Sequence, residues 1–183
     1  MGTRNLVVAL LDGKYKIAQY GQWDGYLNGQ GKTVIDFIKS MKFSKFKKAL
    51  SECSFLSDDE IKSRWEECGA TGQFVSLDVS QKFATKYPEL SRDTGAEVLT
   101  LVQDRGVRKL ANSIDFANDA MFCEYAYVID MDAKKLEIYA GRYEQNDKVK
   151  GRFKSLPLFK TLSFVNCKKK DCLEKLLADK WEN

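Results

Sequence analysis

At 183 residues, with 44% hydrophobic and 12% aromatic side chains, the chain is long enough for one substantial core and short for two domains. Thirty basic residues stand against 26 acidic ones, and a net charge of +4 is too small to indicate a partner such as long nucleic acid or a membrane surface. The absence of histidine removes the usual general base of hydrolases and a common zinc ligand.

The cysteines and the hydropathy pattern bear on the compartment. The five cysteines are odd in number and form no Cys-x-x-Cys pair, so we expect reduced thiols, no metal and no cofactor. No secretory signal opens the chain, and no run of 18 apolar residues occurs. We therefore expect a single cytoplasmic domain over residues 1–183, without a membrane partner.

The first 20 residues predict a β-hairpin. Residues 4–11 and 14–20 carry the apolar and aromatic side chains typical of strands. Asp12 and Gly13 lie between them, and this dipeptide readily adopts the positive φ angles that a tight hairpin turn needs.

Four later segments have apolar side chains at helical spacing, with polar residues or glycine at their ends. We expect helices over residues 33–50 (broken near Lys42), 57–67, 78–87 and 93–103. The third begins at a cap residue, either Asp78 or Ser80, and the fourth is capped by Asp93 or Thr94.

The second half of the chain predicts another hairpin, formed by residues 122–130 and 135–140. Residues 142–155 are polar, and we expect a mobile loop there. Residues 157–165 form either a last strand or an extended arm, and residues 166–183 form a C-terminal helix. No internal repeat or Pro-rich linker interrupts this order. The sequence therefore predicts an α+β fold with a mixed, largely antiparallel sheet built from two β-hairpins, with inserted and flanking helices.

A phosphate-binding P-loop is the first site that the glycines suggest. Gly31-Lys32-Thr33 opens a predicted helix, but five residues separate Gly25 from Gly31, whereas the motif has four, and Tyr26 stands where the motif needs glycine. The preceding strand also belongs to a hairpin and not to a parallel crossover unit. We therefore reject a nucleotide hydrolase of this type.

The segment between residues 18 and 33 favours ligand binding of another kind. Aromatic rings stack on bases with about 1–3 kcal/mol each, and basic side chains and free amides at a helix start bind phosphate. Glycines at positions 29 and 31 would expose such amides. The candidate ligand-binding residues are Thr3, Arg4, Gln19, Tyr20, Gln22, Trp23, Asp24, Tyr26, Gln30 and Lys32, with Arg92 as a second phosphate contact.

Two other interpretations stay open. In one, the same segment is a structural corner, in which the aromatic residues pack, Asp24 binds local amides and the glycines permit turns. Arg92 is then the solvated flank of a helix. In the other, Asp24 and Glu124 form the carboxylate pair of a histidine-independent hydrolase. Cys123 lacks a histidine partner and is typical of a buried strand cysteine.

Several motifs resemble those of a widespread family found in bacteriophages, bacteria and fungi. They are the opening "MGTRNL", the box "YGQWDGY" at residues 20–26, "RDTGAEVL" and the segment "LANSIDFANDAMFCEYAYVIDMDAKKLEIYAG". The resemblance spans about residues 1–142, and Leu27 departs from it, since members often have proline there.

The resemblance implies a family that includes viral anti-CBASS proteins. These proteins bind cyclic oligonucleotide immune signals and sequester them without cleaving them. The resemblance also implies a homo-oligomer. Our leading hypothesis is therefore a non-catalytic protein that binds a cyclic di- or trinucleotide in the host cytoplasm. The alternatives are a hydrolase of a nucleotide or amide, and an interaction protein without a small ligand.

Overall fold

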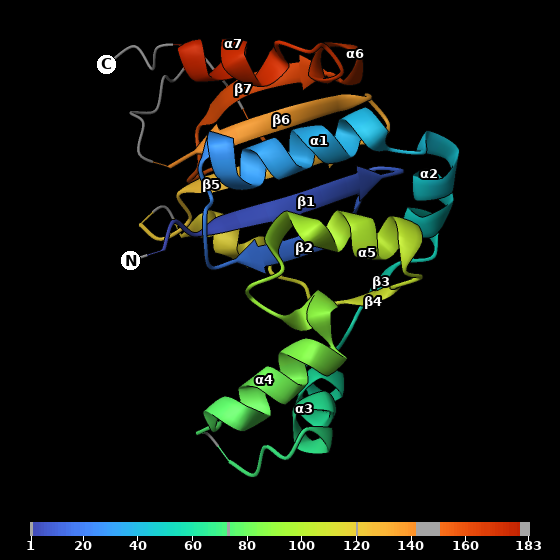
Figure 1. Ribbon diagram of the computed structural model, residues 1–183, viewed down its shortest axis with the longest axis vertical. Helices are drawn as coiled ribbons and strands as arrows, with labels where there is room; N and C mark the ends of the chain where they lie inside the picture. The colour runs from blue at the N-terminus through green and yellow to red at the C-terminus, as the bar shows by residue number, and fades with distance from the viewer. Residues whose placement is uncertain (1, 73, 120, 142–150, 180–183) are drawn as a thin grey trace.

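The computed structural model describes residues 2–72, 74–119, 121–141 and 151–179. Its main strands are β1 (Asn5–Leu11), β2 (Lys14–Gly21), β5 (Tyr125–Asp130), β6 (Lys135–Ala140) and β7 (Leu158–Ser163). They form one sheet in the order β2-β1-β5-β6-β7, in which β1 and β5 are parallel and the other neighbours antiparallel. This mixed, mostly antiparallel sheet confirms the predicted α+β class (Figure 1).

The two predicted hairpins are β1–β2 and β5–β6. Asp12 and Gly13 have φ angles of 52° and 68°, as their hairpin turn requires. The segment predicted as either a strand or an arm is the strand β7, paired with β6. The strand predicted from residue 122 begins only at Tyr125, because the amides of Phe122 and Cys123 donate to the carbonyl of Asp119 in a turn.

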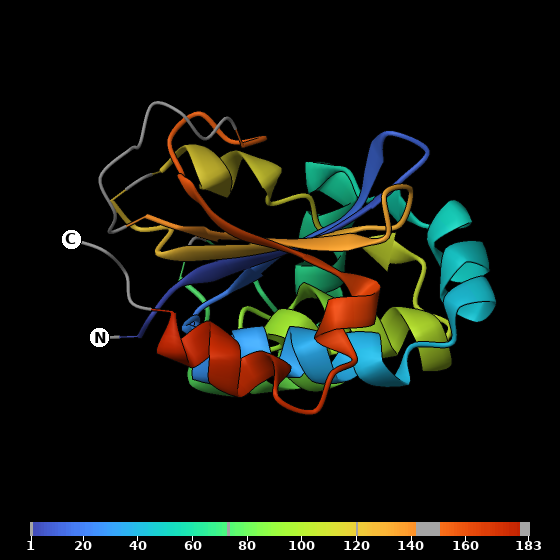
Figure 2. The ribbon, with the colours of Figure 1, turned by 90° about the horizontal axis from the view of Figure 1, so that it is seen from above.

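Helices cover one face of the sheet, and the larger core lies beneath them. They are α1 (Lys32–Ser40), α2 (Phe43–Ser51), α5 (Val98–Asp104), α6 (Phe164–Cys167) and α7 (Cys172–Ala178). Figure 2 shows α1, α5, α6 and α7 on the same side of the sheet. Strand side chains such as Val7 and Ile129 alternate toward this layer and are fully buried against it, which explains why the strands hold their register.

The opposite face carries a smaller core. Leu6, Val8 and Val128 point to this side, where η4 (Ile114–Asn118) and the segment 151–158 cover them. Of the loop predicted at 142–155, residues 142–150 lie outside the described residues. In the described remainder, Phe153 packs edge-on against the ring of Tyr139 with centroids 4.8 Å apart.

A pair of helices projects away from this body (Figure 1). They are α3 (Asp58–Glu67) and α4 (Leu77–Lys86), and we call residues 57–86 the α3–α4 arm. A short parallel pair, β3 (Ser54–Phe55) and β4 (Lys109–Leu110), lies at its base. Ser57 caps α3 through a full capping box. The cap of α4 is Ser76, not Asp78 or Ser80, because its hydroxyl accepts from the amide of Val79.

The predicted C-terminal helix over 166–183 is divided into α6 and α7 in its described part, which ends at residue 179. Cys167 and Cys172 are both buried on the core side. Five residues along one continuous helix would rotate these side chains about 140° apart. A turn through Lys168–Asp171 therefore lets both thiols face the core.

Candidate functional site

The predicted ligand-binding segment lies at one end of the sheet. We call residues 22–31 the WDGY corner. It follows the end of β2, beside the first residues of β1 and β5, which start at the same end because those two strands are parallel. The corner leads through the π-helical turn η1 (Leu27–Gly31) directly into α1. Leu27 is buried in the larger core and so anchors this turn.

The backbone of the corner is closed by its own hydrogen bonds. The amide of Gln30 donates to the carbonyl of Asp24 at 2.7 Å, and the amides of Gly29 and Gly31 donate to the carbonyl of Tyr26 at 3.0 and 3.2 Å. The expectation of free amides at this helix start is therefore wrong. The π-turn uses the donors that a phosphate would need.

Close packing explains the glycines of the corner better than phosphate binding does. A Cβ atom on Gly29 would lie 2.1 Å from the carbonyl oxygen of Asp24, and one on Gly25 would lie 2.8 Å from that of Thr3. Asp24 itself has a φ of 54°, in the left-handed region. The chain at this corner thus approaches itself too closely for side chains at either glycine.

Two buried side chains, those of Asn5 and Tyr127, donate hydrogen bonds to the backbone of the corner. The sequence did not predict a role for either residue. Asn5 donates from Nδ2 to the carbonyls of Gly21 and Trp23, both at 3.2 Å. The hydroxyl of Tyr127 donates to the carbonyl of Gly25 at 2.7 Å. Both residues belong to strands with strong apolar patterns, so their polar atoms carry no periodic signal.

Two of the candidate amide side chains join the corner to the segment before α5. Gln19 is buried and donates to the carbonyl of Ser91 at 3.0 Å. The Oε1 atom of Gln30 accepts from the amide of Ala96 at 2.8 Å. These contacts run across more than 60 residues of sequence and fix the corner against residues 91–96.

Tyr20 and Gln22 bind each other. The hydroxyl of Tyr20 donates to Oε1 of Gln22 at 2.6 Å, while the Tyr20 ring packs edge-on against Phe116 with centroids 4.9 Å apart. Both polar atoms are therefore engaged within the chain.

Trp23 is held at its edge but not covered. Its Nε1 donates to Oδ1 of Asp93 at 2.8 Å, and 47% of the residue is exposed. A Cβ atom on Gly2 would lie 2.3 Å from the indole, so the N-terminal segment packs against the ring.

The prediction that Asp93 or Thr94 caps a helix is wrong. The turn that follows them is η3 (Gly95–Glu97), which has no side-chain cap, and α5 has none either. The hydroxyl of Thr94 donates instead to the carbonyl of Pro88.

Tyr26 and Asp24 form a second exposed pair. The hydroxyl of Tyr26 donates to Oδ1 of Asp24 at 2.9 Å, and 40% of Tyr26 is exposed. This hydrogen bond and the nearby negative charge raise the pKa of Tyr26. Asp24 thereby orients the ring, as Asp93 orients Trp23.

The basic candidates lie in three different settings. The guanidinium of Arg4 lies over the ring of Phe122 at 4.6 Å from its centroid. Lys32 pairs with Asp36 one helical turn later at 2.6 Å, so its positive charge is balanced by that carboxylate. Arg92 is exposed and lines a hollow of about 530 Å³ between α4 and residues 90–93, together with Asp93.

The remaining candidate, Thr3, contacts the corner through its backbone. Its carbonyl accepts from the amide of Gly25 at 2.9 Å.

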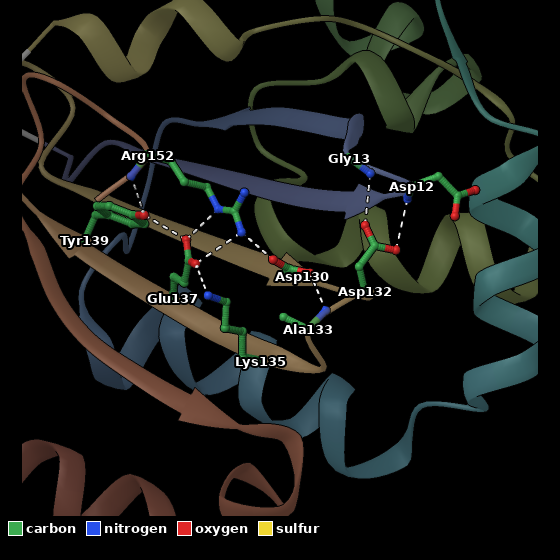
Figure 3. Close-up of polar contacts among 9 residues, drawn as sticks. All are labelled: Asp12, Gly13, Asp130, Asp132, Ala133, Lys135, Glu137, Tyr139 and Arg152. Carbon is green, nitrogen blue, oxygen red and sulfur yellow. Dashed lines mark hydrogen bonds and ion pairs between the residues drawn. The ribbon is translucent and has the colours of Figure 1, made fainter. Parts of the chain in front are cut away.

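A buried ionic cluster lies at the other end of β5, and sequence reasoning missed it (Figure 3). Arg152 contacts Glu137 at 2.7 Å and also contacts Asp130, and both carboxylates are about 95% buried. The hydroxyl of Tyr139 donates to Glu137 at 2.7 Å, and the amide of Arg152 donates to that hydroxyl. Lys135 pairs with Glu137 at 2.9 Å.

Glu137 is charged in this cluster. Burial by itself raises the pKa of Glu137, but hydrogen bonds from Arg152, Lys135 and Tyr139 outweigh burial and hold that pKa below its ordinary value. The cluster therefore ties residue 152 to β5 and β6.

Two residues considered for catalysis have other settings in the structure. The exposed Asp24 carboxylate accepts from Tyr26. Burial raises the pKa of Cys123 to about 12, so its thiol is protonated at neutral pH. Within residues 2–72, 74–119, 121–141 and 151–179, no three cysteine or carboxylate side chains are grouped to hold a metal ion.

The described part of the chain has no helix with the length and apolar character needed to cross a membrane. Comparison with protein-family models, with curated proteins and with solved structures gave no match. The function proposed below therefore rests on the geometry of the corner and on the motifs of the sequence.

Proposed function

We propose that the chain binds a cyclic di- or trinucleotide at the WDGY corner and holds it without chemical conversion. The observation that carries this proposal is the setting of Trp23, whose indole is fixed at one edge by Asp93 while nearly half of the residue is exposed. A ring oriented in advance loses little conformational freedom when a base stacks on it. Tyr26, oriented by Asp24, offers a second such ring.

Arg92 is the best-placed phosphate contact. It follows Ser91, which anchors Gln19, and precedes Asp93, which anchors Trp23. Its side chain is exposed on the hollow of about 530 Å³ beside α4. Arg4 supplies a second positive charge at the same end of the sheet. The binding set is thus smaller than the sequence suggested, because the corner amides and Lys32 are engaged.

The resemblance to anti-CBASS proteins adds a biological setting to this proposal. The bound nucleotide is then an immune signal, sequestered in the cytoplasm of a host cell by a phage-encoded protein that works as a homo-oligomer. Sequestration also fits a corner whose carboxylates serve to orient rings.

Isothermal titration with a panel of cyclic di- and trinucleotides tests the proposal. We expect at least one member to bind with a Kd below about 10 μM, which corresponds to roughly −7 kcal/mol. Mass spectrometry of the ligand released by denaturation should return it unchanged. Absence of binding across the panel contradicts the proposal, and recovery of a hydrolysed product contradicts sequestration.

Arg92→Ala separates ligand binding from folding. The substitution should weaken binding about tenfold or more, equivalent to ~1.4 kcal/mol, because it removes a charge facing phosphate. The melting temperature should stay unchanged, since the exposed side chain makes no hydrogen bond or ion pair recorded within the described residues. Arg105→Ala, at an exposed arginine after α5, is the matched control and should leave affinity unchanged.

A structural corner without a small ligand is the second candidate, favoured by the closed hydrogen bonds and the tight glycines. In that case Trp23→Ala lowers the melting temperature and no nucleotide raises that of the unaltered protein. A thermal-shift screen therefore distinguishes the two candidates directly.

A further inference from the structure

The α3–α4 arm exposes apolar side chains that the rest of the chain leaves uncovered. Phe74 is 97% exposed and Leu77 72% exposed, at the tip where α3 gives way to α4. α3 buries none of its ten residues. Within the arm, the ring of Trp65 stacks on that of Phe83 with centroids 3.5 Å apart, and Lys86 pairs with Glu67. A helix pair of this kind gains apolar burial only by docking onto something.

The arm is also acidic. Residues 57–86 contain six carboxylates and four basic side chains, although the whole chain has a net charge of +4. Asp58 and Asp59, in the first turn of α3, are exposed and have no ion pair recorded within the described residues. The surface that covers the arm is therefore expected to be basic and to have an apolar centre.

The α6–α7 layer has those properties. Residues 158–179 contain five lysines and three carboxylates, and Lys168, Lys169 and Lys170 are exposed with no ion pair recorded in the described part of the chain. A hollow of about 270 Å³ opens between β7, α6 and α7, with Leu162 and Leu176 on its walls. Its rim carries Lys169, together with Lys160 and Lys175, which pair with Asp179 and Asp171.

The size and position of this hollow suit an aromatic knob from another molecule. Its volume exceeds the roughly 150 Å³ cavity that accepts a benzene ring. The arm and the α6–α7 layer lie at opposite ends of the long axis (Figure 1), so the arm does not cover the hollow of its own chain. Two arms would repel each other through their carboxylates, and two lysine turns would repel each other likewise.

We infer that the α3–α4 arm docks on the α6–α7 layer of a second copy of this chain, with Phe74 seated in the hollow. Made once per pair of chains, this contact is head-to-tail and builds a ring or an open chain; made reciprocally by two antiparallel chains, it closes a two-fold dimer. The interface is tested without nucleotide, so its failure is distinguishable from a failure of nucleotide binding.

Sedimentation equilibrium of the full chain tests the interface. The average mass should rise with protein concentration at about 0.05 M salt and fall toward the monomer at about 1 M salt, where charge attraction is screened. Phe74→Asp and Lys169→Glu should each weaken self-association at least tenfold while leaving the circular dichroism unchanged, because both side chains are exposed. Met121→Asp, at another exposed apolar residue, is the control and should associate normally.

Mixing the two variants gives the decisive result. Phe74→Asp retains an intact hollow and Lys169→Glu retains an intact arm, so the mixture should form one-to-one dimers and nothing larger. A monomer at every concentration, association that high salt does not weaken, or a mixture that stays monomeric overturns the inference.

Discussion

Gly29 shows how single residues shape the WDGY corner. Its hydrogen atom faces the carbonyl oxygen of Asp24, and a Cβ atom there would come within 2.1 Å of that oxygen. The obstacle is backbone, which cannot rotate away as a flexible side chain would. The close approach lets the amide of Gln30 reach the same carbonyl at 2.7 Å.

Gly29→Ala should therefore lower the free energy of unfolding by about 1–3 kcal/mol, in the range of an overpacked site. Urea unfolding followed by circular dichroism measures the change. Gly72→Ala is the matched control, because a Cβ atom there meets nothing within 4 Å, and it should stay within about 0.5 kcal/mol of the unaltered protein. Equal stability of the two variants would show that the corner is looser than described.

At the scale of elements, the ionic cluster clamps the segment 151–158 to β5 and β6. Arg152 joins Asp130 to Glu137 across the two strands, and Phe153 and Leu156 then pack on the smaller core. Removal of the guanidinium would leave two buried carboxylates with Lys135 on Glu137 as the remaining ion pair, which is unfavourable because a buried charge that loses its partner is poorly solvated.

Arg152→Ala should cost about 3 kcal/mol at pH 7, the low end for a broken buried pair, since 27% of this side chain is exposed. In the unaltered protein the pKa of Glu137 is depressed, so its stabilisation is present above the unfolded value near 4.3 and is lost as pH falls through the folded pKa. In the variant that pKa should be higher than in the unaltered protein, because the guanidinium that opposes the effect of burial is gone, so acid should relieve the repulsion.

The stability difference between the two proteins should accordingly shrink from pH 7 to pH 4, as measured by urea unfolding at both values. Lys62→Ala, which removes an exposed pair at 3.9 Å, should change stability little at either pH. A deficit for Arg152→Ala that does not depend on pH would argue against the charge mechanism.

At the scale of the whole molecule, the chain consists of a densely packed sheet body and a thinly packed arm. Val128 and Ile129 of β5 are fully buried between the two cores, whereas α3 buries none of its residues. Local stability follows buried apolar contact, so the arm should open independently of the sheet.

Hydrogen exchange followed by mass spectrometry should show this difference. At concentrations low enough for the monomer, we expect amides of α3 to exchange at least about tenfold faster than those of β5, a gap of ~1.4 kcal/mol or more in opening free energy. Exchange in the arm should slow as concentration rises, because docking covers it. Equal protection of α3 and β5 in the monomer would contradict the division.

Most elements were predictable because their signals are local. The Asp12-Gly13 turn, the capping box of α3 and the alternation in β5 and β6 each depend on neighbouring residues. One error arose where a distant partner changed a local preference. Asp93 has the sequence of a helix cap, but its carboxylate binds Trp23, 70 positions away.

The residue types of the candidate site were predictable from the sequence, but the contacts that each residue makes were not. The sequence indicated that aromatic, amide and basic side chains gather around residues 18–33. Which of them face solvent depended on partners far along the chain, such as Ser91 for Gln19 and Ala96 for Gln30. The cluster around Arg152 had no sequence signal, because its members are spread over a polar loop and two apolar strands.

The sequence by itself determined the α+β class, the two hairpins and the glycine-rich corner, because turn dipeptides, caps and periodicity act within a few residues. Only the tertiary structure decided that the corner amides are hydrogen-bonded within the chain and that Trp23 and Arg92 are exposed to solvent. It also decided that an acidic arm projects from the end of the molecule opposite a lysine-rich layer. Those features arise from packing between distant segments, and burial and hydrogen-bond partners are properties of the folded chain as a whole.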